Sequence, residues 1–229
     1  MAISNDSRAR IKKVFKPIAL AMGRLGLTPD GLTLIGFGVT VIGAALLAGQ
    51  QWLAGGVVIF LGGTFDMFDG TLARATGRVS TLGEFMDSVF DRWGEALVYL
   101  GIVTGCAFGG FREGAVLGAA ALGSAFMVSY ARAKSEGLGF TRGTGMAAIG
   151  VMPREVRLVV LSLGLVLAPN PIHEAVPAGA LCAGACDAFQ GGSLTAALLI
   201  ITIGSTLTAI QRILHVRSQA TASTTTPTG

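Results

Sequence analysis

The sequence contains little charge. Asp, Glu, Lys and Arg make up only 13% of its 229 residues, whereas a soluble domain normally carries about a quarter. Hydrophobic residues account for 52% of the chain, and they form apolar runs longer than a globular core needs. The composition therefore argues against a soluble domain and indicates an integral membrane protein.

Cysteine is also scarce. The chain has only Cys106, Cys182 and Cys186, with no CxxC pair, so it lacks the pattern of a zinc site or a disulfide framework. Cys182 and Cys186 would form a disulfide only if both lay outside the membrane. The simpler interpretation is that both serve as small apolar residues. A cleavable signal peptide is not expected, because Arg24 interrupts the apolar stretch after Pro17 and no A-x-A site follows.

Residues 4–26 are predicted to form an amphipathic helix. Apolar side chains recur there at helical spacing, namely Ile11, Val14, Phe15, Ile18, Met22 and Leu25. Six Lys or Arg residues are interleaved with them, which suits a helix lying on an anionic membrane surface. Packing of this helix against another segment of protein is the alternative.

Six long apolar segments follow Pro29, and each is close to the roughly 20 residues that a bilayer requires. We place them near residues 31–49, 52–75, 84–108, 113–135, 154–169 and 190–214. The predicted fold is an all-α integral membrane protein with six transmembrane helices and an N-terminal amphipathic interfacial helix. Residues 1–217 are expected to form a single domain, and residues 218–229 a polar disordered tail.

The basic residues predict the orientation of this layout. All but Arg92 and Arg112 of the 17 Lys and Arg residues fall on one side of the six spans, and such an excess marks the cytoplasmic side. We therefore expect a multi-pass protein of the cell membrane, with both termini, the turn at residues 74–83 and the loop at residues 135–153 in the cytoplasm.

Four aspartates stand out in two neighbouring spans. Asp66 and Asp69 share one helix face, and Asp87 and Asp91, four residues apart, share a face of the next helix. The connecting turn is short, so the two helices are predicted to be antiparallel neighbours. The four carboxylates would then meet at two matched depths near the cytoplasmic end.

Four carboxylates this close repel one another and lose solvation, so cations are expected among them. Ligands that are all oxygen favour Mg²⁺ or Mn²⁺ over zinc. Two such ions would balance the four charges and clamp a diphosphate, while a carboxylate at the edge accepts a hydroxyl proton. Alcohol attack on a lipid-linked diphosphate fits these parts. Salt bridges to Arg74, Arg78 and Arg92 are the structural alternative.

The spacing of these residues resembles the signature of the CDP-alcohol phosphatidyltransferases without departure: Asp66-x2-Asp69-Gly70-x2-Ala73-Arg74-x8-Gly83-x3-Asp87-x3-Asp91. The resemblance implies transfer of a phosphatidyl group from CDP-diacylglycerol to an alcohol, with release of CMP. It implies two Mg²⁺ ions, with Mn²⁺ as the alternative, held by the four aspartates, and Asp91 as general base. It also implies a homodimer. The residues expected to contact the CMP moiety are Gly70, Ala73 and Arg74, with Asp30 and Thr33 nearby.

A second basic cluster bears on the acceptor. Arginine forks match phosphate oxygens, so basic residues beside the site favour a phosphorylated acceptor, although ordinary anchoring of a cytoplasmic loop is the alternative. The stretches "YARAKSEGLG" and "MPREVR" resemble the branch of the family in actinobacteria that uses inositol phosphate. That resemblance implies 1D-myo-inositol 3-phosphate as acceptor. Its expected contacts are Ser129, Arg132, Lys134, Arg154 and Arg157.

Three other functions remain open at this point. A synthase of phosphatidylglycerophosphate would use glycerol 3-phosphate at the same basic cluster. A divalent-cation transporter would distribute acids across the membrane depth, whereas only Glu95 lies deeper than the four aspartates. A structural membrane protein would use the acids in salt bridges. Membrane lipids are the expected surroundings in every case, and no nucleic-acid partner is expected.

Overall fold

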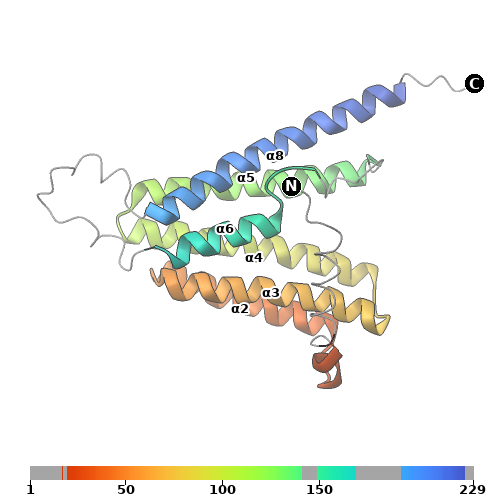
Figure 1. Ribbon diagram of the computed structural model, residues 1–229, viewed down its shortest axis with the longest axis horizontal. Helices are drawn as coiled ribbons and strands as arrows, with labels where there is room; N and C mark the ends of the chain where they lie inside the picture. The colour runs from red at the N-terminus through yellow and green to blue at the C-terminus, as the bar shows by residue number, and fades with distance from the viewer. Residues whose placement is uncertain (1–16, 18–19, 141–148, 169–191, 225–229) are drawn as a thin grey trace, which may run out of the picture.

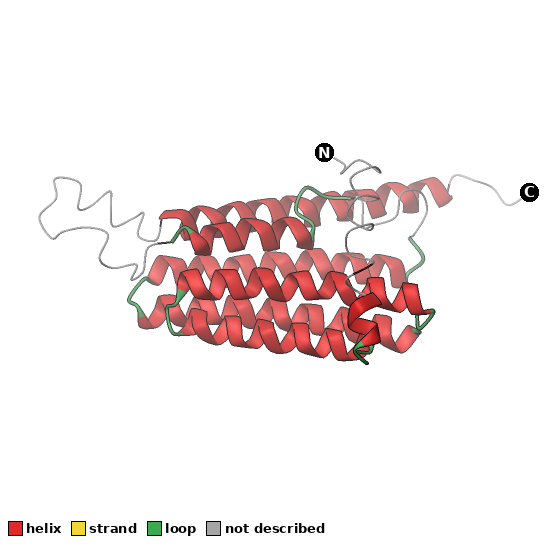
Figure 2. Ribbon diagram, turned by 60° about the horizontal axis from the view of Figure 1, so that its bottom comes forward, coloured by secondary structure: helices red, strands yellow, loops and turns green. Residues whose placement is uncertain are grey.

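The computed structural model describes residues 17, 20–140, 149–168 and 192–224, with the side chains of residues 66, 67 and 222–224 excepted. The described part contains helices and no strand (Figures 1 and 2). The helices are α2 (Pro29–Ala48), α3 (Trp52–Thr76), α4 (Thr81–Phe108), α5 (Arg112–Gly137), α6 (Arg154–Val166) and α8 (Gly192–Thr224). The all-helical part of the predicted fold is therefore confirmed.

These helices lie along the long axis of the molecule (Figure 1). The contacts between them close a ring. Around the ring the order is α2, α3, α6, α8, α5 and α4, and α4 returns to α2. Because consecutive helices alternate in direction, the start of α2, the end of α3 and the start of α4 share one end of the bundle. The end of α5 and the start of α6 lie at that same end.

Helix α2 separates α3 from α4, which differs from the predicted pair of neighbouring helices. Both pack against α2, whereas α3 and α4 are not among the helix pairs in close contact. Small residues on α4 allow its close contact with α2. A Cβ atom added to Gly101 would lie 2.4 Å from the Ala44 carbonyl oxygen, and one added to Gly105 would lie 2.2 Å from that of Leu47. The backbones of α2 and α4 therefore approach more closely than larger residues allow.

The ends of these three helices have local causes. Thr28 caps α2, since its Oγ1 accepts a hydrogen bond from Gly31 N at 3.1 Å. Ser80 caps α4 in the same way, with Gly83 N at 3.0 Å. Gly77 ends α3 in the left-handed conformation, with φ 68°, which glycine adopts without steric cost. The turn between α3 and α4 is therefore short, and the two acidic faces begin at the same level.

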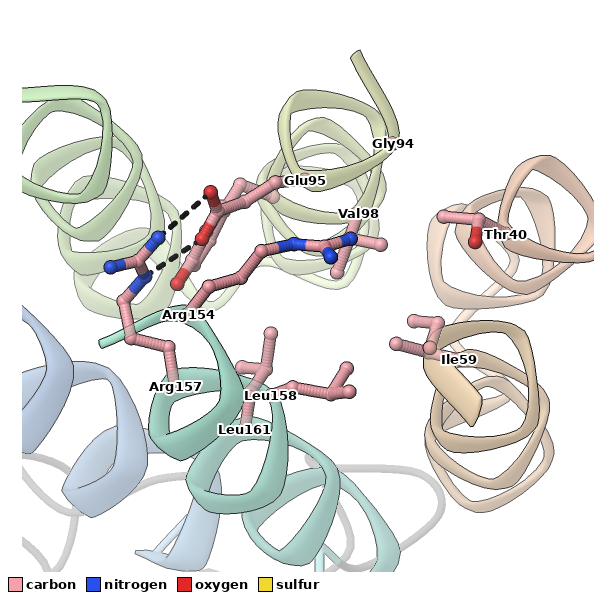
Figure 3. Close-up of a pocket in the computed structure, with 11 residues that line it drawn as sticks. Thr40, Ile59, Gly94, Glu95, Val98, Arg154, Arg157, Leu158 and Leu161 are labelled. Carbon is pink, nitrogen blue, oxygen red and sulfur yellow. Dashed lines mark hydrogen bonds and ion pairs between the residues drawn. The ribbon is translucent and has the colours of Figure 1, made fainter. Parts of the chain in front are cut away.

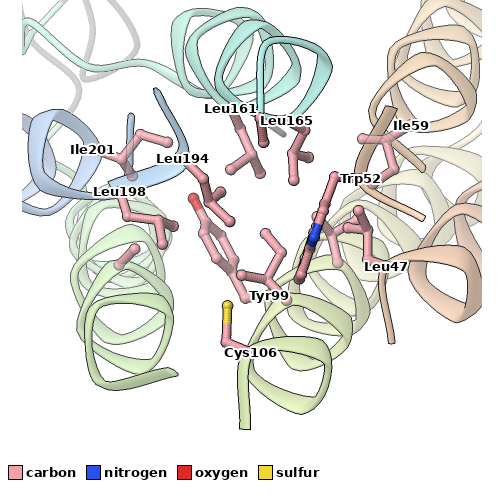
Figure 4. Close-up of a cluster of buried hydrophobic side chains, with 14 of the residues drawn as sticks. Leu47, Trp52, Ile59, Tyr99, Cys106, Leu161, Leu165, Leu194, Leu198 and Ile201 are labelled. Atoms are coloured by element: carbon pink, nitrogen blue, oxygen red, sulfur yellow. The ribbon is translucent and has the colours of Figure 1, made fainter. Parts of the chain in front are cut away.

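The interior of the ring is apolar toward the opposite end of the bundle. Leu47, Trp52, Tyr99 and Leu165 are almost fully buried there (Figure 4), and so is Ile102. Other members of the same cluster come from α5 and α8. The hydrophobic core thus fixes the far end of the bundle and leaves the polar side chains to the end where α2 and α4 begin.

Length and composition make α2, α3, α5 and α8 candidate membrane spans. Many large apolar side chains on the outside of the bundle are exposed, among them Ile42, Phe60 and Ile203, as expected of surfaces that face lipid. Helix α4 carries several acidic residues. Helix α6 has only 13 residues and ends at Val166, whereas the predicted end is residue 169. Of the predicted interfacial helix at 4–26, residues 20–24 are helical and most of the rest lies outside the described residues.

The predicted tail at residues 218–229 is wrong in its first part, because α8 continues through Thr224. Two of its polar side chains bond to the helix's own backbone. Ser218 Oγ donates to the His215 carbonyl at 2.8 Å, and Thr221 Oγ1 donates to that of Arg217 at 3.0 Å. Ser and Thr commonly satisfy their hydroxyls in this way inside helices, so polar composition alone did not mark the helix end.

The close approach of α2 and α4 predicts that Gly105→Ala destabilises the protein. The added Cβ would lie 2.2 Å from the Leu47 carbonyl oxygen, and overpacking of this kind costs about 1–3 kcal/mol. The control is Gly123→Ala, whose Cβ would have no neighbour within 4 Å, so the better helix propensity of alanine leaves stability unchanged or raised. Thermal melting in detergent measures both, and equal melting temperatures would contradict the packing described.

Candidate active site

Asp69 links α3 to α2. Its carboxylate is buried, with 4% of the residue exposed. Oδ2 accepts a hydrogen bond from Thr33 Oγ1 at 2.7 Å, and Oδ1 accepts one from the Gly70 backbone N–H. Two donors therefore fix the orientation of the Asp69 carboxylate at the polar end of the bundle. A fixed orientation is what a ligand of this carboxylate would require.

Asp91 on α4 approaches the same place from the other side of α2. It lines a small cavity together with Thr33, the residue that bonds Asp69. Its Oδ1 lies 3.0 Å from Arg154 Nη1 at the start of α6, and its Oδ2 lies 4.0 Å from Arg92 Nη1. Thr33 thus contacts Asp69 of α3 and borders the small cavity that Asp91 of α4 lines, and the closer grouping of all four aspartates stays a prediction.

Asp87 lies one turn before Asp91 and is half-buried. Both line a cavity of about 970 Å³, which is large enough for a polar substrate. The far walls of this cavity come from α5, α6 and α8. The backbone of Asp66 lies in α3, one turn from Asp69, and its side chain is outside the described part.

The arrangement around Asp69 and Asp91 suits hard cations by ligand type, since the donors are oxygens. Among the side chains that the structure describes, which do not include Asp66, no three or more acids, histidines or cysteines are grouped closely enough to hold a metal. The positive charge of Arg154 compensates the negative charge of Asp91, with which it pairs.

The residues expected near a nucleotide lie on the α2 and α3 side of the site. Arg74 is exposed and its guanidinium folds back over Gly70, where a Cβ atom would lie 3.4 Å from Nη1. Asp30 reaches the start of α4, because a Cβ at Gly83 would lie 3.5 Å from Asp30 Oδ1. Ala73 lies on α3 just before Arg74. The nearest neighbours of Gly70 are thus the guanidinium atoms of Arg74, and those of Gly83 are the Ser80 and Asp30 side chains.

Four of the five predicted acceptor contacts line the large cavity, namely Ser129, Arg132, Arg154 and Arg157. Lys134 is exposed and is not part of that lining. Arg132 forms an exposed pair with Glu136, with 2.9 Å between Nε and Oε1. Arg154 is also partly exposed, and both it and its partner Asp91 line the cavity. The basic cluster and the acidic face thus border one space.

Arg157 differs from the other basic residues because it is buried and held by protein groups. Its Nε and Nη2 donate to the two carboxylate oxygens of Glu95 at 2.8 and 3.0 Å (Figure 3). Its Nη1 donates to the Met152 carbonyl at 3.1 Å. Three of its nitrogens are therefore already engaged. Burial and bidentate pairing make this the most enclosed ion pair among the described residues.

Two residues that sequence reasoning did not assign to the site belong to its surroundings. Glu95 is four residues after Asp91, so it continues the row of Asp87 and Asp91 on one helix face, and that spacing is the signal that could have identified it. Arg212 on α8 lines the cavity and donates to the carbonyls of Val128 and Ile149 at 2.6 and 3.1 Å. No local pattern marks Arg212, because its partners lie far away in the sequence.

The sequence matches known proteins over most of its length. Residues 26–222 match the family model described as CDP-alcohol phosphatidyltransferase. The phosphatidylinositol phosphate synthase of Mycolicibacterium smegmatis is 33% identical over 215 residues, which cover 93% of this chain and 87% of that one. The archaetidylinositol phosphate synthase of Pyrococcus horikoshii is 36% identical over 154 residues, which cover 67% of this chain and 77% of that one.

The fold is also similar to solved structures. The crystal structure of the Mycobacterium tuberculosis phosphatidylinositol phosphate synthase with CDP-DAG bound has a TM-score of 0.71 and 27% identity, covering 89% of this chain and 94% of that one. The same enzyme in complex with manganese and citrate has a TM-score of 0.71 and 28% identity, with 89% of each chain covered. These matches show that the chain belongs to the CDP-alcohol phosphatidyltransferase family.

Proposed function

We propose that this chain is a phosphatidylinositol phosphate synthase of the cell membrane. It transfers a phosphatidyl group from CDP-diacylglycerol to 1D-myo-inositol 3-phosphate and releases CMP. The observation that carries the proposal is the cavity of about 970 Å³ with Asp87 and Asp91 on one wall and Arg132 and Arg154 on others. A phosphorylated polyol needs both kinds of group, since guanidinium forks bind phosphate and a carboxylate accepts the hydroxyl proton.

The reaction exchanges one phosphate ester bond for another. The acceptor hydroxyl oxygen forms a bond to the phosphorus of the phosphatidyl group, and the bond from that phosphorus to the CMP oxygen breaks. Asp91 takes the hydroxyl proton. Arg154 lies 3.0 Å from Asp91 and lines the same cavity, so an acceptor phosphate bound by Arg154 holds the acceptor hydroxyl near the base. Ser129 and Arg132 complete this phosphate site, and Lys134 lies at its margin.

Divalent cations are part of the proposal. Asp66, Asp69, Asp87 and Asp91 would hold two Mg²⁺ ions, with Mn²⁺ as the alternative, because two such ions balance four carboxylates. The fixed carboxylate of Asp69 and its link to Thr33 support this assignment. When bound, the ions polarise the diphosphate and stabilise the charge on the leaving CMP oxygen.

The donor lipid is assigned to the α2 and α3 side. Gly70, Ala73 and Arg74 lie on one stretch of α3, where the small residues admit the CMP moiety to the backbone and the exposed Arg74 binds its phosphate. Asp30 and Thr33, in the first turns of α2, border the same region. The crystal structure of the Mycobacterium tuberculosis relative with CDP-DAG supports this choice of donor.

The topology predicted from the sequence belongs to the same proposal. All six helices cross the membrane, residues 4–26 form an interfacial helix, and the polar end of the bundle with both termini faces the cytoplasm. Four helices with the length and composition of spans support this arrangement, as does the grouping of basic residues at one side. Glycine-rich helices are compatible with a homodimer, which is the oligomeric state we expect.

An acceptor assay tests the proposed function directly. Purified protein is given CDP-diacylglycerol and Mg²⁺ with inositol phosphate, glycerol 3-phosphate, inositol or serine in separate reactions, and CMP release is measured. We expect turnover with inositol phosphate and at least about tenfold less with free inositol, because a lost charged hydrogen-bonded contact costs about 1.5–3 kcal/mol. Faster turnover with free inositol would contradict the proposed binding of the acceptor phosphate. Faster turnover with glycerol 3-phosphate would show that this is the acceptor instead of inositol phosphate.

Asp91→Asn tests the assigned base. The amide keeps the size of the side chain but cannot accept the proton, so CMP release is expected to fall by about 10²–10⁴-fold while the melting temperature stays close to that of the wild type. Glu113→Gln is the matched control, since Glu113 is an exposed acid at the opposite end of the bundle. Activity retained in Asp91→Asn would remove Asp91 from its role.

A further inference from the structure

Arg157 is at the centre of a set of contacts that fixes the start of α6. The chain before α6 is anchored on α8, because Thr208 Oγ1 accepts hydrogen bonds from Val151 N at 3.1 Å and Met152 N at 3.0 Å. Gly150, with φ 118°, allows this approach, and a Cβ there would lie 2.1 Å from Thr208 Cγ2. Arg157 then binds the Met152 carbonyl, which ties the anchored segment to the first turns of α6.

Two ion pairs connect this anchored end of α6 to α4. Arg154 pairs with Asp91, and Arg157 pairs with Glu95. The two acids are four residues apart and the two arginines three apart, so the pairs join the same two helices about one turn from each other. Helices α4 and α6 are not among the helix pairs in close contact. Besides the apolar cluster to which both helices contribute, the ion pairs are the described links between them.

The two pairs differ in exposure. In the Arg154–Asp91 pair the side chains are 38% and 17% exposed, whereas in the Arg157–Glu95 pair they are 2% and 11% exposed. Removing one partner from a buried pair leaves an uncompensated charge at a high cost, so Arg157 does not leave Glu95 readily for a ligand. Arg154 is more exposed, and exchange of its partner costs less.

A small cavity lies beside the buried Arg157–Glu95 pair. A cavity of about 50 Å³ is lined by Arg154, Arg157, Glu95 and Tyr99, and Figure 3 shows Arg154 extending past Glu95 toward Thr40. The Tyr99 hydroxyl has no hydrogen-bond partner among the described groups. Arg154 could therefore turn toward Glu95 if Arg157 did not already occupy that carboxylate.

From these contacts we propose that Glu95 and Arg157 are positioning residues for the acceptor site. By pairing with each other, they hold the start of α6 and keep Arg154 at Asp91 and the large cavity. Arg157 then acts through Arg154 and does not bind the acceptor phosphate itself. This inference rests on the proposed function, since it assigns the acceptor to that cavity.

The test compares Glu95→Gln, Arg157→Gln and the double variant in full-length protein. The KM for inositol phosphate, the KM for CDP-diacylglycerol, kcat and the melting temperature in detergent are measured for each. We expect each single variant to raise the acceptor KM about tenfold with little change in the lipid KM. The double variant, which is neutral and can keep a side-chain hydrogen bond, is expected to lie closer to the wild type than either single variant. Glu113→Gln again serves as control.

Two results would overturn the positioning role. If Arg157 binds the acceptor directly, Glu95→Gln frees it, so the acceptor KM stays unchanged or falls, and the double variant is as poor as Arg157→Gln. If the pair is only structural, both KM values and kcat change together with the melting temperature. Absence of wild-type turnover with every acceptor would instead contradict the proposed function.

A second variant keeps the test decisive if a glutamine variant does not fold. Arg157→Lys keeps the positive charge but loses the planar fork that binds both oxygens of Glu95. The positioning role predicts a raised acceptor KM in this variant with an unchanged lipid KM. An unchanged acceptor KM would contradict the proposal.

Discussion

The close packing of α2 against both α3 and α4 is the constraint on which the site depends. Glycines on α4 let the two backbones meet, and Thr33 on α2 then stands between the acidic faces. It donates a hydrogen bond to Asp69 and lines a cavity with Asp91. Carboxylates at the end of a membrane bundle are costly without compensating charge. In the proposed function, cations bound between α3 and α4 would supply that compensation.

The arginines at this end have two different roles. Arg154 is partly exposed and lines the large cavity beside its partner Asp91, so in the proposed function it can exchange a protein carboxylate for a substrate phosphate. Arg157 and Arg212 are buried and bound to protein acceptors. They hold the segment before α6 and the neighbouring helices in place. In the proposed function, the basic cluster thus divides into side chains that bind the acceptor phosphate and side chains that organise the cavity wall.

Local patterns in the sequence predicted the helices and the acidic faces well. Hydrophobic length and caps placed α2 to within two residues, and the four-residue spacing put Asp87 and Asp91 on one face. The separation of α3 and α4 was not predicted, because a short turn fixes direction but not packing distance. The Glu95–Arg157 pair joins residues far apart in the chain, so only the folded arrangement revealed it. The end of α8 was missed because Ser and Thr side chains bond within the helix.

Binding of Mn²⁺ to the purified protein is the most direct test of the central claim that acids from two separated helices share cations. Calorimetric titration or Mn²⁺ spectroscopy would compare the wild type with Asp69→Asn on α3, Asp87→Asn on α4 and the distant Glu113→Gln. The account predicts that either aspartate variant weakens Mn²⁺ binding by at least about tenfold, since each removes a charged ligand, while the control binds as the wild type does. Unchanged binding in the Asp87→Asn variant would contradict the shared site.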